Sequence, residues 1–218
     1  MTDLSAFLPY TVFLTAAFFL AVTPGPGLFY VFTRSIKGGR REGLTSTLGT
    51  SVGGLFHVLA AALGVSTLLA TSAYAFSAIK YLGAAYLIYL GIKTLLNKDD
   101  VFSSVDMTNA ENVSEGVAQK PSGNAFKQGV ITEVLNPKTA LFFIAFIPQF
   151  IQPEYSVMGQ FVALGCVVVG FNTTADIVVA CLAGPIGGYL QTHSRTQRAQ
   201  KVFCGSAFIA LGAVLGSD

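Results

Sequence analysis

Long apolar stretches alternate with short polar segments along this chain. Most of the six apolar stretches contain about 20 residues or more, which is enough to cross a hydrocarbon layer of about 30 Å as a helix. We therefore predict an all-α membrane protein with six transmembrane helices. The stretches lie at residues 10–32, 44–69, 76–96, 126–151, 157–182 and 202–215, and the last one needs residues 196–201 to complete its length.

The composition excludes a water-soluble fold and makes the lipid bilayer a partner. Of the 218 residues, 52% are hydrophobic and 11% are charged, whereas about 25% are charged in a typical soluble domain. The three cysteines lie far apart in apolar stretches and have no metal-binding or disulfide-scaffold spacing. No basic patch indicates nucleic-acid binding. No Walker loop, metal motif or nucleophile with a neighbouring base indicates a cofactor or an enzymatic reaction.

Basic residues gather in alternate loops between the predicted helices. Cytoplasmic loops of membrane proteins carry an excess of lysine and arginine, so we predict that these loops are cytoplasmic and that both termini are periplasmic. Acidic residues make the middle loop the weakest of the three signals. The basic residues are Arg34, Lys37, Arg40 and Arg41 in the first loop, Lys98, Lys120 and Lys127 around the second, and Arg195, Arg198 and Lys201 in the third.

The chain divides into two halves that resemble each other weakly. Residues 97–124 are polar and lack an apolar period, which predicts a flexible cytoplasmic linker between residues 1–96 and 125–218. Thr23-Pro24 in the first stretch corresponds to Asn136-Pro137 in the fourth. Because each half has an odd number of predicted helices, the second half enters the membrane in the opposite orientation. The sequence thus predicts an inverted repeat, an architecture typical of secondary transporters.

Prolines near the middle of the first and fourth stretches predict two broken helices. A proline lacks an N–H group and leaves the carbonyl four residues earlier without its helical partner. Unpaired backbone inside a membrane is tolerated where it is buried in protein or lines a wet cavity. We predict that the breaks at Pro24 to Pro26 and at Pro137 lie within about 10 Å of each other at a central site. The alternative is a pair of ordinary proline kinks. The freed carbonyls are those of Leu20, Val22 and Glu133.

Four ionisable residues inside the apolar stretches are candidates for function, because such residues are costly in a membrane. Lys138 is placed to bind a substrate carboxylate, or else to pair with Glu133 or extend to the interface. Asp176 is placed to hold a substrate ammonium or a coupling proton, or else to pair with Lys138. Glu133 is a candidate gate or proton acceptor. His57 is either a packing residue or a proton carrier, since histidine titrates near neutral pH.

An ordered set of motifs resembles the LysE/RhtB family of bacterial amino-acid exporters, the lysine exporter and homoserine/threonine resistance family. The resemblance covers nearly the whole chain and implies a cytoplasmic-membrane protein that exports amino acids or close derivatives with the proton gradient. The motifs are Thr23-Pro24-Gly25-Pro26, Gly39-Arg40-Arg41-Glu42-Gly43, Gly49 with Gly53 and His57, Tyr81-Leu82-Gly83-Ala84-Ala85-Tyr86-Leu87 with Leu90-Gly91, and Asn136-Pro137-Lys138 followed by Phe142-Phe143 and Pro148-Gln149-Phe150.

These observations predict a substrate site and leave two other classes of function open. We expect the N–H groups that follow the prolines, together with Lys138, to face a substrate carboxylate, and the freed carbonyls, together with Asp176, to accept from a substrate ammonium. The site should therefore require both charges of an amino acid and favour a neutral side chain. The alternatives are a metal-cation exporter and a membrane enzyme or assembly subunit without transport activity. The oligomeric state stays open, a homo-oligomer included. The predicted substrate-binding residues are Thr23, Pro24, Gly25, Pro26, Asn136, Pro137 and Lys138, and the predicted coupling or gating residues are Asp176, Glu133 and His57.

Overall fold

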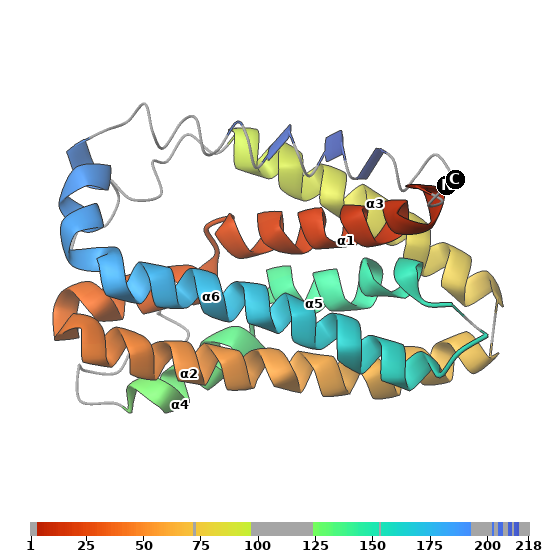
Figure 1. Cartoon of the computed structure of the whole chain (residues 1–218), viewed down its shortest axis with the longest axis horizontal. Coiled ribbons are helices and arrows are strands. Elements are labelled where there is room, and N and C mark those ends of the chain that lie inside the picture. Colours follow the sequence, from red (N-terminus) through yellow and green to blue (C-terminus); the bar gives the residue numbers. More distant parts are fainter. Residues whose placement is uncertain are drawn as a thin grey trace.

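In the residues that the computed structural model describes, all regular secondary structure is helical. The described residues are 4–71, 73–96, 124–152 and 154–192, together with 202, 205–206, 209–210 and 212–213 of the C-terminal segment. The linker, most of the last predicted helix and both termini lie outside this part of the chain. In Figure 1 the helices lie alongside one another in an elongated bundle. They are α1 (Leu4–Val22), α2 (Pro26–Thr71), α3 (Ala73–Leu96), α4 (Ala125–Val134), α5 (Pro137–Ala145), the 3-10 helix η2 (Ile147–Phe150) and α6 (Val157–Thr192).

Among the described residues, two helical segments are long and apolar enough to cross a membrane, namely Pro26–Gly64 and Val157–Ala183. A third is obtained when Ala125–Val134 and Pro137–Phe150, which are bent by 47°, are counted as one broken span. Shorter apolar helices cover Tyr10–Val22 and Ala84–Lys93. The prediction of an all-helical membrane protein is therefore confirmed. Six spans and an inverted repeat remain predictions.

Helix α2 has a sharp kink at Gly39, where the sequence predicts a loop. Gly39 has φ 76° and ψ 179°, a combination that glycine adopts without steric strain. The residues on both sides are helical, and the orange ribbon of α2 reverses at the left end of Figure 1. Arg34 Nη1 lies 3.2 Å from Glu42 Oε2, so a salt bridge joins the two arms. The predicted loop at residues 34–41 is wrong, because one glycine reverses the chain without a connecting segment.

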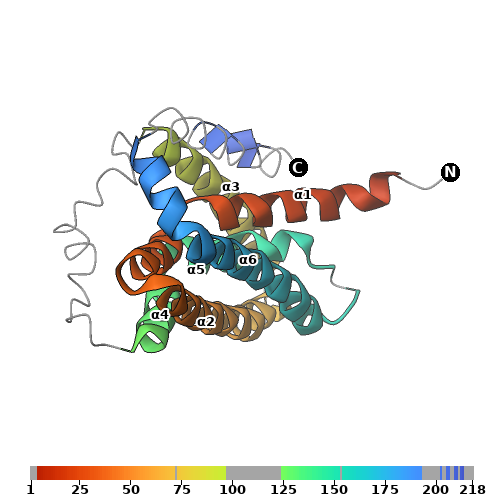
Figure 2. The same ribbon diagram turned by 60° about the vertical axis from the view of Figure 1, so that its left-hand side comes forward.

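Helices α2 and α4 approach each other through glycines. A Cβ atom on Gly49 would collide with the carbonyl of Phe126, and one on Gly129 would lie 3.1 Å from Gly49 Cα. A Cβ atom on Gly53 would lie 2.7 Å from Glu133 Cβ. Figure 2 shows α4 directly beside α2. Small residues at such crossings let two backbones meet closely, and this contact fixes Glu133 against α2.

Aromatic side chains fill the core between α1, α5 and α6. Phe142 and Phe146 have ring centroids 4.6 Å apart, and Phe146 and Phe150 have centroids 4.9 Å apart. Phe13 of α1 contacts Phe150 edge to face at 5.3 Å. Phe13, Phe142 and Phe146 are almost completely buried. This apolar packing fills the bundle between α1 and the segment formed by α5 and η2.

The second arm of α2 carries large apolar side chains on its outer face. Leu59 and Leu63 are 58% and 59% exposed in the isolated chain, and Leu48 is 62% exposed. Residues spaced by three, four or seven positions lie on one face of a helix. A continuous exposed apolar face of this size would be unfavourable in water, and it fits contact with lipid tails.

The glycine contact predicts a difference between two substitutions in the same helix. Gly49→Ala places a methyl group on the backbone of α4, and we expect it to lower the free energy of unfolding by about 1–3 kcal/mol. Gly64→Ala is the control, because a Cβ atom there meets nothing within 4 Å. It should leave stability unchanged or raise it by up to about 1 kcal/mol. Thermal unfolding of the purified variants in detergent measures both, and equal stability would contradict the close crossing.

Candidate functional site

The two predicted breaks lie side by side. Helix α1 ends at Val22 and α2 begins at Pro26, while α4 ends at Val134 and α5 begins at Pro137. Proline suits the first position of a helix, because the missing N–H would have no helical partner there. A Cβ atom on Gly25, in the first break, would lie 3.0 Å from Cε and Nζ of Lys138, which follows the second. The half-helices therefore meet in the middle of the bundle.

Lys138 joins the two breaks through its ammonium group. Its Nζ atom donates to the carbonyl of Leu20 at 2.9 Å and to the carbonyl of Thr23 at 2.8 Å. These carbonyls lie at the C-terminal end of α1, where the helix dipole favours a cation. The carbonyl of Leu20 is one that Pro24 leaves without a helical donor, as the sequence predicts. Its partner in the structure is a protein side chain, whereas the sequence analysis assigned it to a substrate ammonium.

Glu133 is held by hydrogen bonds at the second break. Only 6% of the residue is exposed. Its Oε1 atom accepts from Thr139 Oγ1 at 2.6 Å, and Oε2 accepts from Asn136 Nδ2 at 3.1 Å. The carboxylate lies against the first turn of α2, since a Cβ atom on Gly27 would collide with Oε2. An acidic group at the start of a helix is stabilised by the helix dipole.

The backbone carbonyl of Glu133 is also occupied. It accepts from the N–H of Asn136 at 3.0 Å, and it lies 2.8 Å from Nε2 of His57. A carbonyl only accepts, so Nε2 of His57 carries the hydrogen. The ring of His57 lies 6.0 Å from the ring of Phe143, away from the pocket lining. The expectation that this carbonyl is free for a substrate is therefore wrong, because His57 and the turn at Asn136 both use it.

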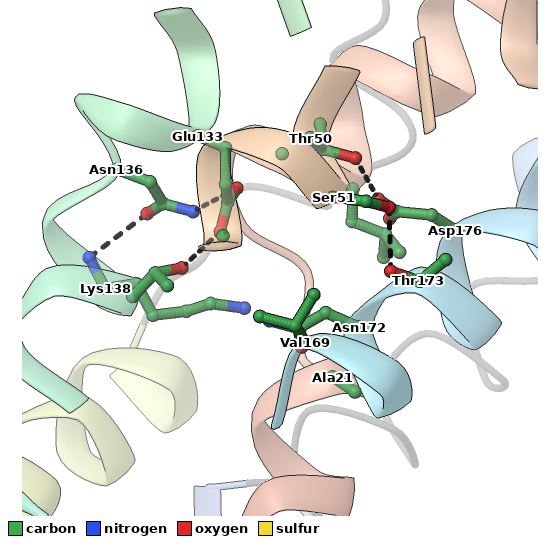
Figure 3. Close-up of a pocket in the computed structure, with 14 residues that line it drawn as sticks. Ala21, Thr50, Ser51, Glu133, Asn136, Lys138, Val169, Asn172, Thr173 and Asp176 are labelled. Carbon is green, nitrogen blue, oxygen red and sulfur yellow. Dashed lines mark hydrogen bonds between the residues drawn. The ribbon is translucent and has the colours of Figure 1, made fainter. Parts of the chain in front are cut away.

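A pocket opens between α2, α5 and α6 beside the two breaks (Figure 3). Its cavity volume is about 30 Å³, room for about two water molecules, within about 410 Å³ of empty space that includes the open mouth. Glu133, Asn136 and Lys138 form one side in Figure 3, and Asp176 lies opposite with Thr50 and Thr173. The lining residues are Ala21, Gly27, Leu28, Thr50, Ser51, Gly54, Glu133, Asn136, Lys138, Thr139, Val169, Asn172, Thr173 and Asp176.

Asp176 and two hydroxyl groups form the α6 side of the pocket. Only 6% of Asp176 is exposed, and its Oδ2 atom accepts from Thr50 Oγ1 at 2.7 Å. Next to it, the Oγ atom of Ser51 and the Oγ1 atom of Thr173 lie 2.7 Å apart. Ser51 also donates to the carbonyl of Thr47 at 2.7 Å, so Thr173 supplies the hydrogen between the two side chains.

The structure sorts the predicted site residues into two groups. Asn136, Lys138, Glu133 and Asp176 line the pocket. The others do not line the pocket: five belong to the backbone breaks, and His57 binds the backbone next to one of them. These residues are Thr23, Pro24, Gly25, Pro26, Pro137 and His57. Thr23 is buried, and its hydroxyl group donates to the carbonyl of Phe19 at 2.6 Å.

Sequence analysis missed five polar lining residues. Asn172, Thr173 and Asp176 are spaced by three and four positions, which places them on one face of α6. Thr50 and Ser51 are adjacent hydroxyl residues in an otherwise apolar stretch of α2. Polar residues grouped on one face of a membrane helix indicate a surface turned toward protein or a cavity. That signal is present in the sequence, but hydroxyl and amide groups are less costly in a membrane than charges and therefore stand out less. Thr139 lies within the motif after Pro137 and is the fifth.

The ionisable side chains in the pocket comprise two acids and one base. Among the described lining residues these are Glu133, Asp176 and Lys138. Within the described ranges, no three side chains of His, Cys, Asp or Glu come together. The pocket therefore offers hydrogen-bond acceptors and negative charge to a small polar molecule.

Comparison with known proteins identifies the family. The model of a family described as LysE type translocator matches residues 18–218, which includes every residue of the pocket. The chain belongs to the LysE type translocator family. It is thus a membrane translocator and not an enzyme, and the resemblance seen in the motifs is confirmed.

Three relatives cover nearly the whole translocator. A homoserine/homoserine lactone efflux protein of Salmonella typhimurium is 31% identical over 206 residues, which are 94% of each chain. An uncharacterized membrane protein of Vibrio cholerae is 29% identical over 99% of this chain and 98% of its own. The membrane protein YrhP of Bacillus subtilis is 30% identical over 93% and 91%. No solved structure matches the translocator.

The contacts of Lys138 predict a loss of stability when its ammonium group is removed. Lys138→Met leaves the carbonyls of Leu20 and Thr23 without this donor, and a buried polar group that loses its partner costs about 1–3 kcal/mol. Lys127→Met is the control, because Lys127 is exposed on α4. Unfolding of both variants in detergent measures the difference. Lys138→Met with the stability of the control would show that the ammonium does not hold the two breaks together.

Proposed function

We propose that this translocator is a secondary active exporter of a small amino acid or amino-acid derivative with a neutral side chain. The observation that supports it is the buried pocket where two broken helices meet, with the carboxylate of Asp176 on its wall. Ionisable groups at such a depth are costly and indicate substrate or ion pathways. Transport sites of secondary transporters are commonly built from discontinuous helices near the middle of the membrane.

Proton antiport follows if substrate and proton compete for Asp176. A substrate ammonium neutralises the carboxylate during export, and a proton neutralises it on the return. A site with an empty, ionised Asp176 does not reorient between the two sides of the membrane, because a buried unpaired charge is strongly unfavourable. Each cycle with a zwitterionic substrate moves one positive charge inward. At 100 mV this movement is worth roughly 2.3 kcal/mol, or about a fifty-fold gradient.

The proposed setting is the bacterial cytoplasmic membrane, with six spans in two inverted repeats. The charge pattern supports a cytoplasmic position for the three basic segments and periplasmic termini. Both halves contain a break after which a helix starts at proline, at Pro26 in one and at Pro137 in the other. This repetition supports a pseudo-twofold arrangement of the two breaks around the pocket.

The named relatives suggest which compounds to test first. The Salmonella protein is named for efflux of homoserine and homoserine lactone. Both compounds carry an ammonium and no second basic group. In the pocket, Lys138 and Glu133 already bind protein groups, which leaves Asp176 to hold one ammonium. A substrate with a basic side chain would need a second acid, so we favour neutral side chains.

Counterflow in proteoliposomes that contain only this protein tests the function. Vesicles loaded with unlabelled amino acid should accumulate the same amino acid in labelled form. The compounds to test are homoserine first and then a panel of neutral, acidic and basic amino acids.

With a proton gradient, the wild-type protein should concentrate its substrate. Asp176→Asn should fold normally and lose concentrative transport, because it nearly preserves shape and removes the charge. Glu154→Gln, an exposed acid before α6, is the control. No counterflow of any panel member would refute the proposal.

A double substitution tests whether Asp176 instead serves only to neutralise Lys138. In that case Asp176→Asn leaves a buried cation unpaired and lowers stability, and adding Lys138→Gln restores both folding and transport. We expect the double variant to remain inactive. Melting temperature and concentrative export are measured for the two single variants and the double one, and full export by the double variant would remove both residues from the mechanism.

Reporter fusions test the orientation. A fluorescent protein that matures only in the cytoplasm should stay dark when it is fused after Asp218. The same protein inserted within residues 97–124, the proposed cytoplasmic linker, should fluoresce. Bright fusions at Asp218 together with a dark linker would reverse the topology. Two bright positions would contradict the odd number of spans proposed between the linker and the C-terminus, because an odd number places them on opposite sides of the membrane.

A further inference from the structure

The positive groups around the pocket already have partners within the protein. The ammonium of Lys138 donates to two carbonyls at the end of α1. Moving it toward a substrate carboxylate would withdraw a donor from both carbonyls. Lys138 therefore completes the break in the first half of the chain, and it is not held ready for a ligand.

The starts of the half-helices are also covered. The carboxylate of Glu133 lies against the first turn of α2 at Gly27, where the helix dipole favours an anion. At the start of α5, the side chain of Asn136 accepts from the backbone N–H of Lys138 at 3.1 Å. Thus an acid and an amide of the protein occupy the two places to which the sequence analysis assigned a substrate carboxylate.

Asp176 differs from these groups. In the described part of the chain its side chain has one hydrogen bond, from Thr50, although an ionised carboxylate can accept about four. The hydroxyl groups of Ser51 and Thr173 lie on the same side of the pocket, with the amide of Asn172 nearby (Figure 3). An ammonium has three hydrogens to donate, and this side supplies oxygen atoms to accept them.

We propose that the pocket recognises its substrate through the ammonium group alone, bound at Asp176, and makes no essential contact with a substrate carboxylate. This inference rests on the proposed export function and defines its substrate class. Substrates are small compounds with one primary ammonium, whose carboxyl group is free, amidated, esterified or closed into a lactone. It replaces the expectation from the sequence that both charges of an amino acid are required.

Competition in the counterflow assay distinguishes recognition of the substrate ammonium from recognition of the substrate carboxylate. Labelled homoserine is the transported compound, and the competitors at pH 6 are homoserine, homoserinamide and N-acetylhomoserine. Homoserinamide, which has only the ammonium, should compete as well as homoserine. N-acetylhomoserine, which has only the carboxylate, should compete at least about 30-fold more weakly, the loss expected when one partner of a buried charge pair is removed. Strong competition by N-acetylhomoserine, or none by homoserinamide, would overturn the inference.

The variant Lys138→Gln provides a second comparison. Because the ammonium of Lys138 is proposed to contact only protein, this change should alter the apparent affinities for homoserine and homoserinamide by the same factor. A loss for homoserine at least about tenfold greater than for homoserinamide, which corresponds to about 1.4 kcal/mol, would place the substrate carboxylate on Lys138. If Lys138→Gln does not fold, the competition experiment with the wild-type protein still tests the inference.

Ligand-induced stabilisation keeps this inference separate from the export function. Homoserinamide should raise the melting temperature of the purified wild-type protein in detergent, because a ligand that binds only the folded state stabilises it. N-acetylhomoserine should not, and Asp176→Asn should abolish the shift. The absence of counterflow for the whole amino-acid panel would refute the export function. The absence of a shift with homoserinamide would refute ammonium recognition, whether or not homoserine is transported.

Discussion

A helix that breaks inside a hydrocarbon layer must find new partners for the backbone groups that it releases, because no water is present to solvate them. This chain breaks two helices at nearly the same place and lets each break satisfy the other. The ammonium of Lys138, just after the second break, binds the carbonyls of Leu20 and Thr23 at the first. The carboxylate of Glu133, just before the second break, lies against the start of α2. The pocket lies beside these two joined breaks.

Much of this architecture could be predicted from the sequence. Prolines at positions 24, 26 and 137 in otherwise apolar stretches indicate breaks, because proline has a definite effect on a helix. The partners of the freed groups could not be predicted, because a carbonyl such as that of Glu133 binds whichever donor the tertiary fold brings near, here His57. The kink at Gly39 was missed for a different reason: basic residues suggested a loop, but a single glycine with positive φ reverses the helix.

The contacts at the breaks determine what remains for a ligand. The helix ends and the charged groups near them neutralise one another, and the glycines at positions 49, 53 and 129 bring α4 close enough to α2 for this to occur. Asp176 lies on another helix, outside this exchange, with hydroxyl groups around it. A site with one buried acid of this kind suits a cation that can leave and be replaced by a proton. In the proposed antiport cycle, the fold supplies the rigid frame around one exchangeable charge.

The position of a bound substrate tests this account most directly. The measurement is an experimental structure of the protein in a lipid nanodisc with homoserine at saturating concentration. The account predicts the ammonium within hydrogen-bonding distance of Asp176, about 2.7–3.2 Å, with Lys138 still bound to the carbonyls of Leu20 and Thr23. A homoserine carboxylate bound to Lys138, with the ammonium away from Asp176, would contradict it.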